Sequence, residues 1–189
     1  NSEGASPLHM AAAAGQVEAI KVLVTLGLNK EAKSENGGTP LHWAAGKGQV
    51  QAIKVFVELL GADKEAKTAV GSRPLHWAAQ EGHPEAVKVL AQLGVDMNAK
   101  AADGATPLHA AVHRGHVEVI KVLVQSGVDK EAKGLGGTTP LHQAAFNGHE
   151  EAIKVLVHLG VDTEAKGAHG ATPLHVAAIR GQVEAIKAL

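Results

Sequence analysis

The chain contains twelve histidines, and histidine is both a common metal ligand and the side chain whose charge changes near neutral pH. Three of them have a spacing that suits a metal site: His109 and His113 are four residues apart, and His116 follows three residues later. On a helix, residues four apart share one face, so two imidazoles could meet one zinc ion. The chain has no cysteine, and no carboxylate completes the set. We therefore expect neither a metal nor any other cofactor.

Pairs of glutamate and lysine are the second pattern that could support chemistry, because adjacent acid and base groups can exchange protons. The partners are three residues apart, in the pairs Glu18/Lys21, Glu85/Lys88, Glu118/Lys121, Glu151/Lys154 and Glu184/Lys187. On an exposed helix surface, such a pair contributes only about 0.2–0.5 kcal/mol of stability. Neither a nucleophile with its base nor a phosphate-binding loop stands outside the repeated patterns. The sequence therefore predicts a protein that is not an enzyme.

Both patterns recur because the whole chain repeats one unit. The tripeptide Pro-Leu-His begins at Pro7, Pro40, Pro74, Pro107, Pro140 and Pro173, so the successive steps are 33, 34, 33, 33 and 33 residues. A period of this length predicts a stacked array in which neighbouring units share one core. We expect a single domain over residues 1–189, with repeats at 1–33, 34–67, 68–100, 101–133, 134–166 and 167–189.

The unit at residues 104–133 indicates two helices joined by a short turn. Thr106 suits an N-cap, and a proline after it suits the first helical position, where a missing N–H costs nothing. Gly115 is expected to end this helix. The second helix, at residues 117–126, has only a narrow polar stripe, so most of its surface must be buried, and Gly127 is expected to end it. The glycine-rich segment that follows predicts an extended turn.

The series Gly-x-Thr-Pro-Leu-His-x-Ala-Ala followed by Gly-His resembles the ankyrin repeat, and the resemblance covers essentially the entire chain. It implies an all-α solenoid with an inner helix, an outer helix and a projecting β-hairpin loop in each repeat. Five repeats would be full, and the sixth would be truncated. The family resemblance also implies a protein that binds other proteins.

Most histidines then have a structural explanation. Those in Pro-Leu-His are expected to bond the capping threonine or nearby backbone and to tie one turn to the next, at His9, His42, His76, His109, His142 and His175. Three more follow the glycine that ends the first helix, namely His83, His116 and His149. His158 lies on the predicted solvent stripe of its helix. Because His109 already has a structural role, the zinc hypothesis loses one of its three ligands.

Two repeats depart from the pattern in ways that affect stability. The second repeat has one extra residue within Glu58–Gly61, which must bulge or lengthen its outer helix. In the third repeat, Arg73 replaces the capping threonine, Ala91 replaces a valine, and Met97-Asn98 replaces Lys-Glu. We expect the third repeat to be the least stable interior unit.

The loops and the ends also differ from the family pattern. The aspartate that usually opens the hairpin turn is replaced by Ser34, Thr68, Ala101, Gly134 and Gly167, and we expect Asn36 and Asp103 to substitute in part. The terminal repeats keep the interior apolar pattern at Leu8, Ile20, Val22, Ile186 and Leu189. Either flanking repeats have been removed, or the ends are apolar. We expect a monomer that can associate end to end at high concentration.

Composition narrows the classes of partner. Eighteen basic residues face nineteen acidic ones, which gives no strong field for nucleic acid or anionic lipid. No apolar run is long enough to span a membrane, and residues 1–4 lack the pattern of a signal peptide. We therefore expect a soluble, cytoplasmic protein. Near-identical Lys-Glu-Ala-Lys blocks suggest recent duplication or consensus design, although the third repeat argues against a strict consensus.

The candidate binding surface is the face of the first helices that does not point into the core, which lines the concave side of the solenoid. The residues selected on it are Trp43, Lys47, Trp77, Glu81, His113, Arg114, Gln143, Phe146, Asn147 and Arg180. The hairpin tips vary too and are expected to contribute. The two tryptophans could instead simply fill the gap between helices. The predicted function is a protein-binding module or scaffold, and the alternative is an engineered or excised array without a dedicated ligand.

Overall fold

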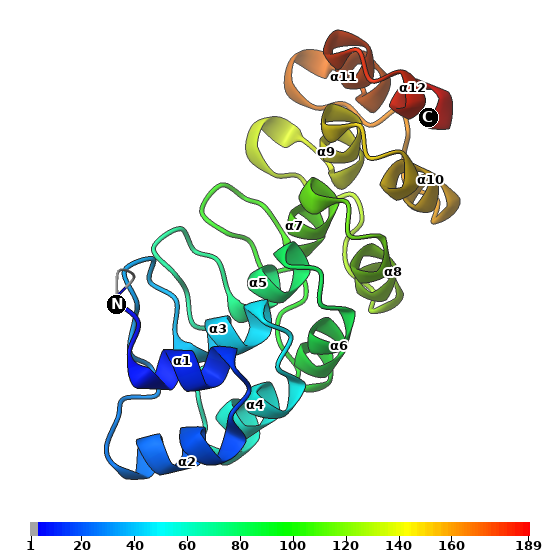
Figure 1. The fold of residues 1–189 in the computed structure, drawn as a ribbon. Coiled ribbons are helices and arrows are strands. Elements are labelled where there is room, and N and C mark those ends of the chain that lie inside the picture. Colours follow the sequence, from blue (N-terminus) through cyan, green and yellow to red (C-terminus); the bar gives the residue numbers. More distant parts are fainter. Residues whose placement is uncertain (1–3) are drawn as a thin grey trace.

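The computed structural model describes residues 4–189. The expectation that no signal peptide opens the chain therefore lies mostly on residues 1–3, outside the described part. Residues 4–189 form twelve α-helices in six successive pairs and contain no β-strand. Figure 1 shows the pairs stacked into one curved array, with the two ends of the chain at opposite ends of the stack. The predicted all-α solenoid is confirmed, but the loops between repeats within residues 4–189 contain no strand where the resemblance implied β-hairpins.

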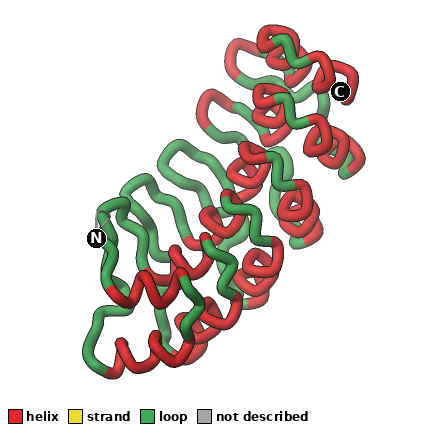
Figure 2. Tube along the Cα trace, viewed as in Figure 1, coloured by secondary structure: helices red, strands yellow, loops and turns green. Residues whose placement is uncertain are grey.

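The first helix of each pair contacts the first helix of the next pair, and together they form the inner row. These inner helices are Pro7–Ala13 (α1), Pro40–Gly46 (α3), Pro74–Gln80 (α5), Pro107–Arg114 (α7), Pro140–Asn147 (α9) and Pro173–Arg180 (α11). The outer row consists of Val17–Thr25 (α2), Val50–Lys54 (α4), Pro84–Gln92 (α6), Val117–Gln125 (α8), Glu150–His158 (α10) and Val183–Ala188 (α12). Figure 2 shows the loops that join successive repeats projecting from the inner side of the stack.

The ends of α7 confirm the reading of the repeated unit. Pro107 occupies the first helical position, and the Oγ1 atom of Thr106 accepts a hydrogen bond from the amide of His109 at 3.4 Å. The helix ends at Gly115, whose φ of 72° lies in the left-handed region that glycine adopts without steric cost. Gly127 ends the outer helix in the same way, with a φ of 80°.

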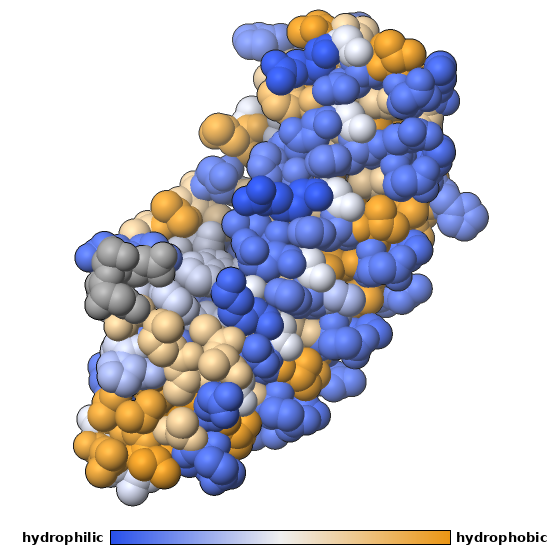
Figure 3. Space-filling view, in the orientation of Figure 1, coloured by the Kyte–Doolittle hydropathy of each residue, from blue (hydrophilic) through white to orange (hydrophobic). Residues whose placement is uncertain are grey.

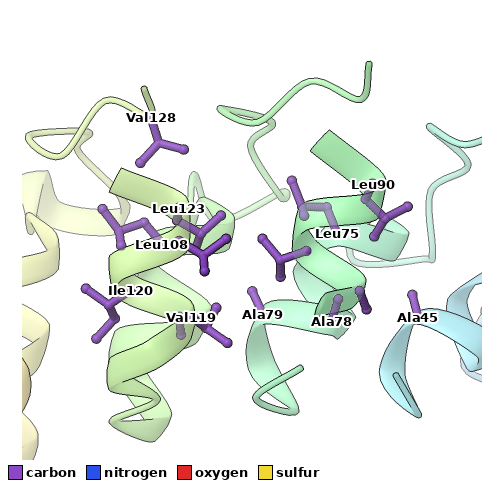
Figure 4. Packing of buried hydrophobic residues seen from close by; sticks show 14 of the residues in the cluster. Ala45, Leu75, Ala78, Ala79, Leu90, Leu108, Val119, Ile120, Leu123 and Val128 are labelled. Atoms are coloured by element: carbon purple, nitrogen blue, oxygen red, sulfur yellow. The ribbon is translucent and has the colours of Figure 1, made fainter. Parts of the chain in front are cut away.

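One continuous core runs between the two rows of helices. Small residues such as Ala78 and Ala79 are fully buried, which lets neighbouring inner helices approach closely. Leu90 of the third repeat and Leu123 of the fourth belong to the same cluster of buried side chains (Figure 4). Since each repeat completes the core of its neighbour, the repeats are stable only as an array.

The extra residue of the second repeat is accommodated by a π-helical turn. Helix α4 runs directly into this turn, Val55–Leu59 (η1), in which the amide of Leu60 reaches the carbonyl of Val55 at 3.0 Å. Phe56 within the turn is fully buried, whereas Leu59 is 63 % exposed. Of the two expected outcomes, a bulge and a longer helix, the structure shows the bulge, and the wider turn keeps the core contact while it displaces a side chain into solvent.

Arg73, which replaces the capping threonine, forms ion pairs with two carboxylates. Its guanidinium cannot accept a bond from the helix amides, but its Nη1 atom lies 2.6 Å from a carboxylate oxygen of Glu65 and 3.3 Å from one of Asp96. Glu65 in turn accepts a hydrogen bond from the backbone amide of Asp96 at 2.7 Å. The arginine thus links the loops of two repeats, although its buried Nε atom has no hydrogen-bond partner.

The inter-repeat loops keep their closing hydrogen bonds without the usual aspartate. The amides of Ser34, Thr68, Ala101, Gly134 and Gly167 each donate to a carbonyl four residues later at 2.9 to 3.0 Å. Asn36 Oδ1 accepts from the amide of Gly38 at 3.0 Å, and Asp103 Oδ1 from that of Ala105 at 2.9 Å. The predicted substitution by Asn36 and Asp103 is confirmed. The last two loops contain short 3₁₀ turns, Leu135–Gly137 (η2) and Ala168–Gly170 (η3).

The two ends of the stack differ from each other. Leu8 and Ile20 are fully buried against the second repeat. The apolar surface of the first repeat therefore comes from other residues, such as Val22, which is 55 % exposed. Figure 3 shows hydrophobic side chains gathered at the end of the stack where α2 lies. At the other end, Ile186 is exposed and Leu189 is half-buried. Association through these ends stays a prediction.

Candidate protein-binding surface

A ladder of buried histidines fixes each inner helix to the next repeat. The Nε2–H of His42 donates to the carbonyl oxygen of Ser72 at 3.1 Å, while its Nδ1 accepts from the amide of Thr39 at 3.1 Å. The same link joins His9 to Gly38, His76 to Ala105, His109 to Thr138 and His142 to Ala171, at 3.0 to 3.2 Å. The expectation that these rings tie one turn to the next is confirmed for these five histidines, and His175 of the last repeat bonds the capping Thr172 at 2.8 Å.

These hydrogen bonds require a neutral ring, because the Nδ1 atom must be an acceptor. Burial disfavours the charged form and lowers the pKa of His9, His76 and His109 below the ordinary value. Burial lowers the pKa of His42 furthest, to about 4. These four rings are therefore uncharged at neutral pH, and the ladder acts as structural framework.

A second ladder uses the residue that follows the helix-ending glycine and points backwards along the stack. The Nε2–H of His83 donates to the carbonyl of Gly46 at 3.1 Å, and that of His116 donates to the carbonyl of Gln80 at 2.9 Å. His149, Gln49 and Gln182 make the corresponding bonds to His113, Ala13 and Phe146. The second group of histidines is therefore also framework.

The three histidines with ligand spacing do not converge. His109 points to Thr138 of the next repeat, and His116 points to Gln80 of the previous one. Only His113 of this set is exposed. Within residues 4–189, no three His, Cys, Asp or Glu side chains are placed to share a metal ion.

Four of the predicted binding residues line one groove. Trp43, Lys47, Trp77 and Glu81 meet there with Asn36 around a space of about 210 Å³ between α3 and α5. The charged side chains are exposed, and the two indoles are half-buried. Apolar rings beside a charged rim are typical of protein-binding surfaces.

Each indole also packs on the preceding repeat. The ring of Trp77 lies edge-on to that of His42, with centroids 5.3 Å apart, and Trp43 makes the same contact with His9 at 5.6 Å. A Cβ atom at Gly38 would stand only 2.9 Å from Trp77, and one at Gly46 would stand 3.2 Å away. The two indoles therefore line one groove, but each makes its aromatic ring contact with a histidine of the preceding repeat. Part of their role is to fill the gap between helices.

The remaining predicted residues form two smaller groups towards the C-terminus. Gln143 and Asn147 donate side-chain N–H bonds to the Nδ1 atom of His113, at 3.2 and 3.3 Å. The guanidinium of Arg180 lies over the ring of Phe146, 4.3 Å from its centroid, in a cation–π contact. Arg114 is exposed beside the first group. The selected residues thus follow the inner helices as three clusters, and Gln143 and Phe146 of the last two line one groove.

The family model described as ankyrin repeats (3 copies) matches residues 1–68, 54–134, 75–167 and 131–189. The chain belongs to the ankyrin repeat family. Its structure is similar to the crystal structure of an ankyrin repeat domain from Acinetobacter baumannii AYE, with a TM-score of 0.79 and 29 % identity over 96 % of this chain and 95 % of that one. No curated protein matches the sequence.

The convex side of this ankyrin repeat array carries the glutamate and lysine pairs. Glu118 and Lys121 are 2.7 Å apart, and the four matching pairs lie within 2.9 Å, all with exposed glutamates. The predicted solvated ladder is confirmed. In residues 4–189, no helix is both long and apolar enough to cross a membrane.

The ankyrin array has a second concave space, of whose lining residues the sequence analysis selected His113 and Gln143. A groove of about 550 Å³ lies between α5 and α7, beside Ala110. The signal for it was the small residue at the position that carries tryptophan in the two preceding repeats. Whether a small residue at this position leaves a groove depends on how closely the repeats stack, which the sequence does not specify.

Proposed function

We propose that the protein binds a partner protein through the inner-helix surface, with the groove between Trp43 and Trp77 as its centre. Ankyrin repeats are generally protein-interaction modules, and this chain belongs to that family. The observation that carries the proposal is the meeting of two indoles with Lys47 and Glu81 around one groove. Rings of this kind supply much of the energy at interfaces, while charged rims mainly affect orientation and rate.

The groove is also prepared for binding. The contacts of Trp77 with His42 and Gly46 hold its ring in place before any partner arrives. A side chain that is already fixed loses little conformational entropy on association, so more of its contact energy appears as affinity. The convex surface offers no such feature, since its glutamates and lysines are paired along five of the six outer helices.

The chemistry favours protein over other classes of partner. The formal net charge is −1, whereas nucleic-acid binding draws its affinity from a surplus of basic residues. We propose no catalytic role, because the buried histidines of the Pro-Leu-His motifs and those that follow the helix-ending glycines make framework hydrogen bonds. A cytoplasmic location remains part of this proposal.

A second candidate function is a structural array without a dedicated ligand. The observation that favours it is the packing of Trp77 on Gly38 and Gly46, which would explain the indole without any partner. In that case, replacing the tryptophans would lower stability and nothing else.

A comparative pull-down distinguishes the two candidates. The immobilised chain is compared with a Trp43→Ala/Trp77→Ala variant, a Lys47→Glu/Glu81→Lys variant and a convex Glu118→Ala/Lys121→Ala variant. We expect a protein that the wild-type and convex variants retain and that both groove variants lose. The charge-swapped variant keeps both indoles, so it separates binding from stability. If all four chains capture the same proteins, the array has no partner at this groove.

A further inference from the structure

The first and last repeats expose the two halves of the junction that joins successive repeats. We call the surface of a repeat that packs on the preceding repeat its entry face, and the surface that packs on the following repeat its exit face. We propose that the exit face of the sixth repeat binds the entry face of the first repeat of a second copy of this chain. The sequence alone predicts association through the ends but not its direction. The groove between Trp43 and Trp77 takes no part in this contact.

The entry face is exposed in the first repeat and buried where another repeat precedes it. Ala19 and Pro7 are exposed, whereas the residues at the same two positions are buried in all five later repeats. Val22 is 55 % exposed, whereas Val89 at the same position is 7 % exposed. The face is therefore apolar, and an interior repeat covers it with the repeat before it.

The exit face shows the reverse pattern and is exposed in the sixth repeat. Leu174 is 44 % exposed, and Ile186 and Ala178 are exposed with it. The residues at these three positions are buried in every earlier repeat, including Leu8 and Ile20 of the first. Since the first repeat packs only on the second within residues 4–189, the following repeat is what covers this face.

The polar groups of the junction are divided between the two ends in the same way. Within the array, the side-chain amide of Gln49 donates from the entry face of the second repeat to the carbonyl of Ala13 at 3.0 Å. Gln16 stands at the same position of the first repeat and is exposed. In the sixth repeat, the carbonyl at the position of Ala13 belongs to Ile179. Head-to-tail stacking would bring Gln16 of one copy to Ile179 of the other.

The imidazole of the exit face is also in place. His142 donates from Nε2 to the carbonyl of Ala171 in the next repeat at 3.0 Å. His175 is exposed at the same position, and its Nδ1 atom lies 2.8 Å from the hydroxyl of Thr172, as in the other repeats. Its ring is therefore oriented by the same local contact that orients His142 towards the following repeat.

The junctions inside the array identify the occupant of each end. Five times between the first and sixth repeats, an exit face packs on an entry face through neighbouring inner helices. The exposed faces carry the same residue types, so a second copy offers each end the surface that covers its counterparts. The two faces lie at opposite ends of the stack (Figure 1). Such a contact does not close on itself, so further copies can add as the concentration rises.

Sedimentation equilibrium of the chain over a series of concentrations tests the inference. We expect the average mass to rise with concentration through the dimer to larger species. Val22→Glu and Leu174→Glu should each weaken the association at least about tenfold, because each places a charge in an apolar junction. Leu135→Glu is the control, since Leu135 is 76 % exposed on a loop away from both faces, and it should associate like the wild type. A wild-type chain that stays monomeric at every concentration would overturn the proposal.

A mixture of the two blocked variants tests the direction of the contact. Val22→Glu keeps its exit face and Leu174→Glu keeps its entry face, so the mixture should form a dimer of one copy of each and nothing larger. Ala178→Glu replaces Leu174→Glu if circular dichroism shows that the latter is unfolded. Association of either folded variant with itself as strongly as the wild type, without any gain on mixing, would mean that like faces meet and would contradict the inference.

Discussion

The imidazole of His42 donates a hydrogen bond to the carbonyl oxygen of Ser72, in the next repeat, across 3.1 Å. Equivalent bonds connect the other repeats, so the motif Pro-Leu-His caps its own helix and also connects it to the next repeat. A residue that does both couples local helix formation to the stacking of the array. The stability of the array should therefore depend on the protonation of these rings.

The first prediction is that the free energy of unfolding falls as the pH drops from about 6.5 towards 4. The pKa of His42 is lowered from 6.5 to about 4, so the unfolded chain binds more protons in this range and is favoured as the pH falls. This one group accounts for about 3 kcal/mol. Urea unfolding at a series of pH values measures the effect.

The control for this prediction is the exposed His158, whose replacement by glutamine should leave the pH dependence unchanged. His42→Gln should lower stability at neutral pH and flatten its fall between pH 6.5 and 4. Equal slopes for the wild type and His42→Gln would show that the buried ring is not responsible.

The second prediction concerns Met97, which stands where the first, second and fourth repeats place a lysine. Lys130 donates from Nζ to the carbonyl of Leu159 at 2.6 Å, and Lys64 makes the same kind of bond to Leu93. We expect Met97→Lys to raise the free energy of unfolding by about 1 kcal/mol, since it restores a hydrogen bond between the third and fourth repeats. Chemical denaturation measures the change.

Asn98 is the matched comparison for this substitution. Its Oδ1 atom accepts from the amide of Asp129 at 2.8 Å, as glutamate does at the other junctions. Asn98→Ala should therefore lower stability by about 1 kcal/mol. A Met97→Lys variant that is less stable than the wild type would mean that the packing of Met97 outweighs the missing bond.

The third prediction is that the third repeat opens before the fourth and fifth. At the N-cap of its inner helix, Arg73 replaces the threonine of the other interior repeats, and its outer helix has the smaller Ala91 at a half-buried position where other repeats carry valine. Native-state hydrogen exchange should show lower protection in α5 and α6 than in α7 to α10. Ala91→Val should raise the unfolding midpoint, because two methyl groups are added next to the core. Uniform protection across these helices would refute the prediction.

The regular features of the fold could be predicted from the sequence because they are local. The prolines, glycines and alanines of each unit set where the helices begin, end and approach one another. The type of accommodation at residues 55–59 could not be predicted, since a bulge and a longer helix both absorb one residue. The ion pairs of Arg73 were also missed, because Glu65 and Asp96 come near it only after neighbouring loops stack.

The candidate site was predictable only in part for the same reason. The positions of Trp43 and Trp77 in the unit place them on the inner face, and the groove they share follows from stacking. The contact of each indole with the preceding histidine depends on the spacing between repeats. The groove beside Ala110 arises from a small side chain, which gives a weak signal unless its neighbours are known.

The fourth prediction separates the structural role of Trp77 from its role in binding. Trp77→Ala removes a ring that packs on Gly38 and Gly46, so the free energy of unfolding should fall by about 3 kcal/mol. Trp77→Phe keeps a ring and should lose less than half as much. Thermal or chemical unfolding of the three chains gives this comparison. Equal stability of all three would mean that the indole contributes no packing.

The most direct test of the central claim is the dissociation constant of a captured partner, measured by calorimetry for the wild type and two double variants. We predict that Trp43→Ala/Trp77→Ala weakens binding at least about 30-fold, which corresponds to about 2 kcal/mol. The convex Glu118→Ala/Lys121→Ala variant should change it less than about twofold, as expected for solvated pairs. If the convex variant bound more weakly while the folded double tryptophan variant bound as tightly as the wild type, the interaction would lie on the convex face. That result would contradict the proposed binding surface.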